Sequence, residues 1–107
     1  MSVALLAPPQ RLFAQFDELK TRWQNETEHL SSPTEIALHP AYQRIIGLGP
    51  QAIPLILNEL DRQPHQWFWA LKAITGEDPV PKSDRGRVAA MARAWLAWGD
   101  ENGWRMG

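Results

Sequence analysis

The chain contains no cysteine, and this absence excludes several kinds of chemistry at once. Without thiols there is no disulfide framework, no thiolate zinc site and no cysteine nucleophile. The 107 residues must therefore hold together by packing alone. A domain of this size buries roughly 65% of the surface that its extended chain exposes, which suffices for a hydrophobic core.

The sequence also lacks an excess of basic charge and a long hydrophobic run. Its formal net charge is −1, whereas domains that bind phosphates normally carry a clear basic excess. The apolar stretch VALLA has no basic region before it and ends at Pro8, far short of a membrane span. We therefore expect neither nucleic acid nor a membrane as the partner, and we expect a cytoplasmic protein.

No group of side chains has the spacing of a catalytic or metal-binding motif. His29, His39 and His65 form no compact ligand pair, and the Glu26-x-x-His29 element lacks the second copy that di-metal bundles require. No serine lies in a G-x-S-x-G turn, and Pro50 removes a backbone donor that a phosphate-binding loop needs. We predict no catalytic residue, no metal ligand and no cofactor.

Apolar residues instead recur at helical spacing along most of the chain, and no segment alternates with the period of two that a strand requires. The first predicted helix covers 9–30, and a short helix capped by Ser32 follows it. A further helical segment covers 40–48, and two more helices cover 50–61 and 64–75. The last helix is capped by Ser83 or Asp84 and closed by Gly99. The prediction is an all-α fold, a compact bundle of four to five helices. It forms a single domain, 1–107, with flexible ends at 1–8 and 100–107.

Residues 47–76 form two of these predicted helices around a tight break. The segment GPQAIPLIL followed by WFWALKAITG resembles a HEAT-like helical repeat unit, which implies a helical hairpin in the middle of the fold. The chain as a whole is similar to small bacterial all-helical proteins that share HPAYQRIIGLG, WFWALKAITGEDPVP and AWLAWG. That second resemblance implies no activity, cofactor or catalytic residue.

Six tryptophans are unusual in so short a chain, and each can bury on the order of 150–250 Å². Trp69 lies about 160° from Leu71 around its helix, so it either belongs to a core buried on two sides or is exposed as a binding residue. Trp104 either folds back onto the core or frays with the tail. Four others share the apolar faces of their helices and are predicted to lie in the core: Trp23, Trp67, Trp95 and Trp98.

The favoured hypothesis is a non-catalytic protein-binding adaptor or regulatory module, with antitoxin-like or immunity-like neutralisation of a partner as one concrete form. An exposed tryptophan flanked by charge is typical of binding hot spots. A stiff, proline-held loop follows the helix of Trp69 and supplies such charges. The predicted partner-binding residues are Trp69, Lys72, Asp78, Lys82 and Arg85.

Two other functions stay open. Segment 82–93 carries four cations against one carboxylate, a net charge of +3, so a nucleic-acid-associated accessory protein is the alternative. An enzyme is the third, and it requires an acid–base pair that assembles only in three dimensions, such as Asp78 or Asp84 with a histidine. In the nucleic-acid alternative the binding residues are Lys82, Arg85, Arg87 and Arg93.

We expect circular dichroism of the purified protein to show a mostly helical spectrum, because amphipathic segments account for most of the chain and no strand pattern competes. A strand content above about one fifth, close to that of an average mixed domain, would contradict the predicted fold class.

Overall fold

The computed structural model describes residues 8–105, and every regular element in that part of the chain is helical. The predicted all-α class is thereby confirmed, but these residues form six α-helices rather than four or five. Residues 1–7 and 106–107, parts of the predicted flexible ends, lie outside the described residues. The α-helices are α1 (Pro8–Thr27), α2 (Pro33–Ala37), α3 (Pro40–Gly47), α4 (Ile53–Arg62), α5 (Phe68–Thr75) and α6 (Val88–Glu101), joined by the 3₁₀ turns η2 (Gly49–Ala52) and η3 (Lys82–Asp84).

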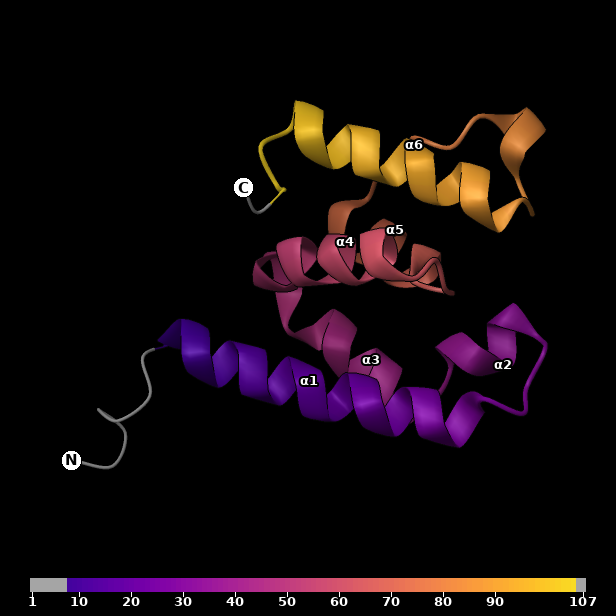
Figure 1. Cartoon of the computed structure of the whole chain (residues 1–107). Coiled ribbons are helices and arrows are strands. Elements are labelled where there is room, and N and C mark those ends of the chain that lie inside the picture. Colours follow the sequence, from indigo (N-terminus) through magenta and orange to yellow (C-terminus); the bar gives the residue numbers. More distant parts are fainter. Residues whose placement is uncertain (1–7, 106–107) are drawn as a thin grey trace.

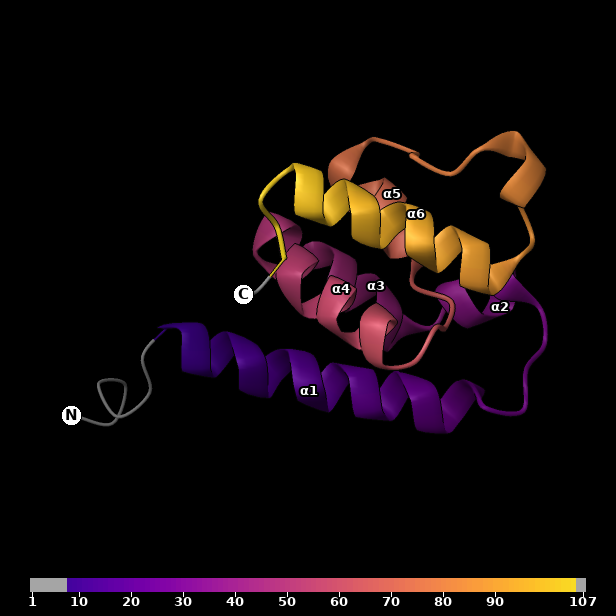
Figure 2. The same cartoon turned by 45° about the horizontal axis from the view of Figure 1, so that its top comes forward.

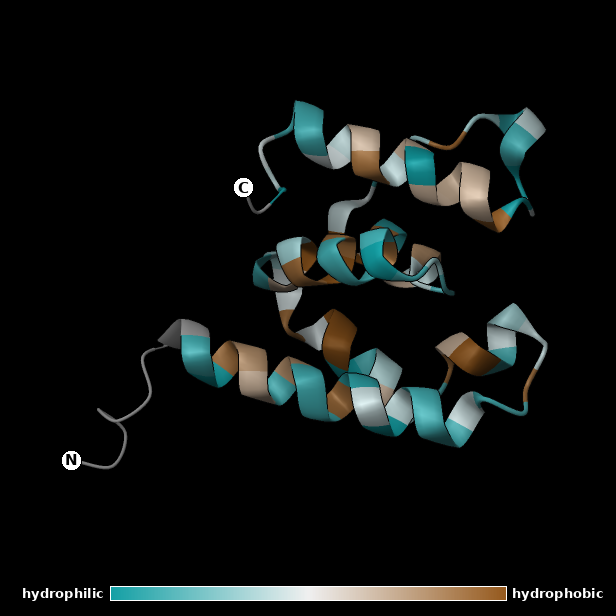
Figure 3. Cartoon of the chain, viewed as in Figure 1, coloured by the Kyte–Doolittle hydropathy of each residue, from teal (hydrophilic) through white to brown (hydrophobic). Residues whose placement is uncertain are grey.

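The helices are stacked between two outer ones, α1 and α6 (Figure 1). Between them, α3 packs on α1 and on α5, while α4 packs mainly on α6 (Figure 2). The helices α4 and α5 make their largest contacts with other helices rather than with each other, so the expected HEAT-like hairpin is not confirmed. Hydrophobic residues recur along each helix (Figure 3), and all six contribute to one shared core.

Most helix ends follow the predicted signals. The Ser32 hydroxyl accepts a hydrogen bond from the Glu35 amide at 3.4 Å and caps α2, as the sequence indicated. Gly76 ends α5 with a left-handed φ of 72°. The first helix stops at Thr27, short of the predicted Leu30, where the buried Thr27 hydroxyl donates to the Trp23 carbonyl at 2.6 Å.

Two helices begin later than predicted. The first turn after Gly49 is 3₁₀, and α4 begins at Ile53 rather than residue 50. An α-helix starting at Pro50 needs a bond from the residue-54 amide to the Pro50 carbonyl, and Pro54 has no N–H to donate. The next helix, α5, begins at Phe68 rather than residue 64, and the chain between α4 and α5 starts with Gln63 extended, at φ of −154° and ψ of 105°.

The predicted limits of the last helix are also wrong. Ser83 and Asp84 belong to the separate turn η3, and α6 begins at Val88 with no side-chain cap. Gly99 does not close α6, which continues to Glu101 and is followed by Gly103 in the left-handed region at φ 74°.

Gly99 is required by close packing instead. A Cβ atom at Gly99 would lie 2.6 Å from the Leu57 Cδ1 methyl on α4 and 3.3 Å from the Arg105 side chain. Leu57 is fully buried, so its methyl has little room to move. The glycine that the sequence marks as a helix end therefore lets α6 approach α4 closely.

The tail after α6 returns to the core. Trp104 is half-buried against the core residues, and its amide donates to the Gly99 carbonyl at 2.8 Å. The Arg105 guanidinium then donates to the Asp61 carboxylate on α4 at 2.8 Å. Of the two readings left open for Trp104, folding back is the one observed. The four tryptophans predicted to be core, Trp23, Trp67, Trp95 and Trp98, are all buried.

A cluster of aromatic rings joins α1 to α3 and to the segment before α5. The indole of Trp23 lies 4.8 Å from the Tyr42 ring, 5.1 Å from the His65 ring and 4.6 Å from Trp67, measured between centroids. All three pairs are tilted, an arrangement that the charge distribution of aromatic rings favours. The Trp23 N–H also donates to the Ile36 carbonyl at 2.9 Å and so fastens α2 to α1.

The hydroxyl of Tyr42 forms an N-terminal cap for α5 from a different helix. Trp67 is the N-cap residue of α5 and offers no side-chain acceptor. The Tyr42 hydroxyl instead accepts from the Ala70 amide at 2.9 Å and donates to the Gln66 carbonyl at 2.8 Å. It therefore satisfies one of the amides that every helix start leaves unpaired, and it fixes where α5 begins.

We expect Gly99→Ala to lower the free energy of unfolding by about 1–2 kcal/mol, because overpacking against Leu57 outweighs the better helix propensity of alanine. Gly47→Ala is the matched control. It lies at the end of α3 with open space around the added Cβ, so its expected effect is neutral or a gain of up to about 1 kcal/mol. Urea denaturation measures both, and equal effects would contradict the close-packing role of Gly99.

Tyr42→Phe keeps the buried ring and removes only the hydroxyl. We expect it to lower the free energy of unfolding by about 1–3 kcal/mol, since the Ala70 amide and the Gln66 carbonyl both lose a buried partner. Hydrogen exchange should accelerate at the Ala70 amide and stay unchanged in α4. Unaltered exchange at Ala70 would show that the hydroxyl does not cap α5.

Candidate binding groove

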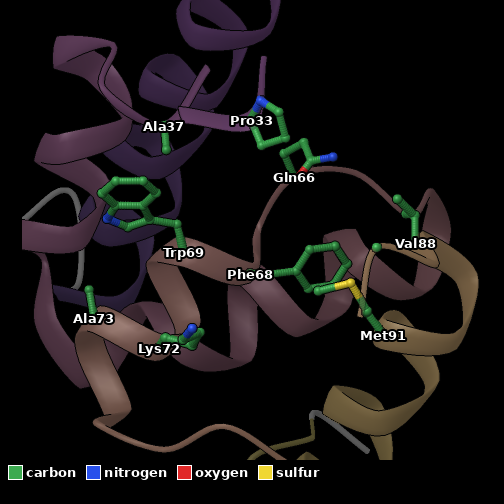
Figure 4. A pocket seen from close by; sticks show the side chains of 10 residues that line it. Pro33, Ala37, Gln66, Phe68, Trp69, Lys72, Ala73, Val88 and Met91 are labelled. Carbon is green, nitrogen blue, oxygen red and sulfur yellow. The ribbon is translucent and has the colours of Figure 1, made fainter. Parts of the chain in front are cut away.

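A groove of about 700 Å³ lies over α5, between α2 and the start of α6 (Figure 4). We call it the α5 groove. Its volume is within the range of small-molecule and peptide-side-chain pockets, about 300–1,000 Å³. It is lined by Pro33, Ala37, Gln66, Phe68, Trp69, Lys72, Ala73, Gly86, Val88 and Met91.

The floor of the groove is one face of α5. Phe68, Trp69, Lys72 and Ala73 have the spacing that places neighbouring turns of a helix on the same side. In Figure 4 the Phe68 ring points toward Met91 on the α6 wall, while the Trp69 indole lies on the side of Ala37 and α2. Phe68 is buried, but the Trp69 side chain is 43% exposed. Of the two readings open for Trp69, exposure is the one observed.

The positions of the groove walls depend on the hydrogen bonds of the aromatic cluster. The Trp23 indole N–H donates to the carbonyl of Ile36, which is next to the lining residue Ala37. The Tyr42 hydroxyl donates to the Gln66 carbonyl, and the side chain of Gln66 also lines the groove. The surface is thus built on buried contacts and not on a free loop.

Burial disfavours the charged form of both titratable members of this cluster. Burial raises the pKa of Tyr42 well above its usual value, and the hydrogen bond from the Ala70 backbone only partly opposes this. The hydroxyl therefore keeps the proton that it donates to Gln66. Burial lowers the pKa of His65, whose Nδ1 atom accepts from the Gln66 amide at 2.7 Å.

Two of the five predicted partner-binding residues line this groove, and two more are joined to it by ion pairs. Trp69 and Lys72 line it, and the Lys72 ammonium lies 3.7 Å from the Asp78 carboxylate. The same carboxylate lies 3.4 Å from the Arg85 guanidinium, so three of the predicted charges form one connected group. Lys82 lies on η3, and among residues 8–105 it forms no ion pair.

None of the four cations of the nucleic-acid alternative is among the residues that line the α5 groove. Arg85 and Arg87 flank Gly86 at the α5 groove, and Arg87 lies 3.5 Å from the Asp84 carboxylate. Arg93 lines a second hollow, of about 410 Å³, on a different face of α6, together with Asp84 and Glu101. Carboxylates thus accompany the basic segment along its length.

Sequence reasoning missed most of the apolar lining, in particular Pro33, Ala37, Val88 and Met91. These residues come from segments far apart in the chain, and Val88 and Met91 also match the core stripe of α6. One signal was present in Phe68 and Trp69. Adjacent residues on a helix point about 100° apart, so two large neighbouring rings do not both fit one narrow stripe.

Residues 8–105 contain no group of three His, Asp or Glu side chains that could hold a metal ion. Asp78 and Asp84, the carboxylates considered for an acid–base pair, face cations, while His39 pairs with Glu26 at 2.7 Å. Over the same residues, no helix has both the length and the apolar composition needed to span a bilayer.

Comparison with known proteins adds no assignment to this geometry. The chain matches no protein-family model, no curated protein and no solved structure. Any function for it must therefore be argued from the α5 groove and the residues around it.

Proposed function

We propose that the protein is a non-catalytic protein-binding adaptor or regulatory module and that the α5 groove is its binding surface. The observation that carries this proposal is the exposed indole of Trp69 on the floor of an apolar groove. Antitoxin-like or immunity-like neutralisation of a partner in a bacterial cytoplasm is one concrete form of such a function. The HEAT-like resemblance of residues 47–76 is in keeping with it, since helical repeats commonly present binding surfaces.

The exposed area of the Trp69 indole sets how much binding free energy a partner gains by covering it. With 43% of the Trp69 side chain accessible, roughly 100 Å² remains to be covered by a partner. At about 25 cal/mol per Å², covering this area contributes about 2–3 kcal/mol. That is the level at which one residue counts as a binding hot spot.

The charges around the groove favour protein over nucleic acid. Arg85 and Arg87 each face a carboxylate, at 3.4 and 3.5 Å, and the whole chain carries a net charge of −1. A phosphate backbone relies on an excess of basic charge, which these paired arginines in a chain of net charge −1 do not supply. A protein partner needs only the apolar floor and one or two such charges.

We expect the double variant Trp69→Ala, Arg85→Glu to keep the fold and to lose the partner. Both side chains are exposed, so the melting temperature should stay within a few degrees of the parent protein. Affinity capture from the native host, quantified by mass spectrometry, should show the principal bound protein depleted at least about tenfold. Phe13→Ala is the matched control, because the Phe13 side chain is 45% exposed on α1.

Three results would contradict the proposal. Unfolding of the double variant would place Trp69 in the core. Equal losses for Phe13→Ala would mean that capture depends on general surface stickiness. Binding that falls steeply with salt, and depends on Arg87 and Arg93 as much as on Arg85, would identify nucleic acid as the partner.

A further inference from the structure

The α5 groove has features that select the kind of protein segment it binds. We propose that its occupant is an amphipathic helix of the partner, with acidic residues beside its apolar stripe. This inference rests on the proposed function and deepens it by naming the form and the charge of the bound segment.

The lining has too few polar groups to hold an extended peptide. Among the lining residues, only Gln66, Lys72 and the indole N–H of Trp69 offer polar side-chain groups. The floor is the side-chain face of α5, and residues 8–105 form no strand whose edge a peptide could extend. An extended segment would therefore leave backbone donors and acceptors unpaired on an apolar surface. A helix arrives with its backbone hydrogen bonds already made.

The shape of the groove also fits a helix. The exposed face of α5 lies in a groove bounded by residues of α2 and of the start of α6. The small residues Ala37, Ala73 and Gly86 line the groove and leave space for the side chains of an incoming helix at ordinary helix–helix distances of about 8–10 Å. The eight residues of α5 span about 12 Å, which matches two to three turns of a partner helix.

The charge of the lining indicates acidic residues on that helix. No lining residue is acidic, and Lys72 is the cation on the floor. Arg85, next to the lining residue Gly86, shares the Asp78 carboxylate with Lys72 and so places a second cation beside the floor. The ion pairs of Lys72 and Arg85 with Asp78 are 3.7 and 3.4 Å long. Both cationic side chains are more than half exposed, although the Asp78 side chain is only 26% exposed, so a carboxylate of the partner can compete with Asp78 for them.

Fluorescently labelled peptides of about 14 residues, nearly four helical turns, test this occupant directly. The first peptide carries leucines at i, i+3, i+4 and i+7 with glutamates on the flanking positions. The second replaces each glutamate by lysine, and the third inserts two central prolines that prevent helix formation. The fourth is a proline-rich extended peptide. Binding of each to the full chain is measured by fluorescence anisotropy.

We expect the acidic helical peptide to bind at least about fivefold more tightly than its lysine counterpart and at least about tenfold more tightly than the proline-interrupted one. The variant Trp69→Ala should weaken it about tenfold or more, while Phe13→Ala should leave it unchanged. The double variant Lys72→Glu, Arg85→Glu should reverse the preference, so that the lysine peptide binds more tightly than the acidic one. Circular dichroism melts of each variant verify that the fold is kept.

Several outcomes would overturn this inference. Binding of none of the four peptides, no preference between the acidic and lysine peptides, or an unchanged preference in the charge-reversed variant would each refute it. Tighter binding of the proline-rich peptide would assign an extended occupant. A dimer in size-exclusion chromatography that Trp69→Ala dissociates would assign a second copy of the chain. If host-protein capture still depends on Trp69 in these cases, the proposed function stands and only the helical occupant is refuted.

Discussion

The hydrogen bonds of two buried rings determine the geometry of this molecule's candidate surface. Tyr42 reaches from α3 to the Gln66 carbonyl and the Ala70 amide, and Trp23 reaches from α1 to the Ile36 carbonyl. The bonds of Tyr42 set the start of α5, and the bond of Trp23 sets the position of α2. Together they place the floor and one wall of the α5 groove. In a chain without cysteine, these ring contacts do what cross-links do in disulfide-rich domains of similar size.

Periodicity was sufficient to predict the core but not the groove. Trp23 and Trp95 fall on long apolar stripes, and the structure buries both completely. Prolines and glycines mark most helix ends, with two exceptions. Pro54 has no N–H to donate, so α4 begins later than predicted. Gly99 predicts a helix end, but it serves instead the close contact with Leu57. Trp69 stayed ambiguous because α5 has only eight residues and few polar positions, so its apolar face has no clear edge. The groove itself was not predictable, since three segments distant in sequence form it.

The same residue type serves two purposes here. Three tryptophans are fully enclosed and lock the helices together, whereas Trp69 projects from a helix that the enclosed ones hold in place. An exposed indole on a rigid helix loses little conformational entropy when a partner covers it, because its backbone is already ordered. The ion pairs beside it are long and exposed, so the charged rim contributes selectivity more than affinity.

The uneven burial of the tryptophans also has an optical consequence. Four of the six indoles are buried, Trp104 is half-buried, and among residues 8–105 only Trp69 is exposed. A soluble quencher such as acrylamide therefore reaches Trp69, which lies in the groove, more readily than the four buried indoles. The emission of the buried tryptophans thus reports on folding, and the quenchable emission of Trp69 reports on occupancy of the groove. Intrinsic fluorescence can therefore follow folding and groove occupancy in solution without any label.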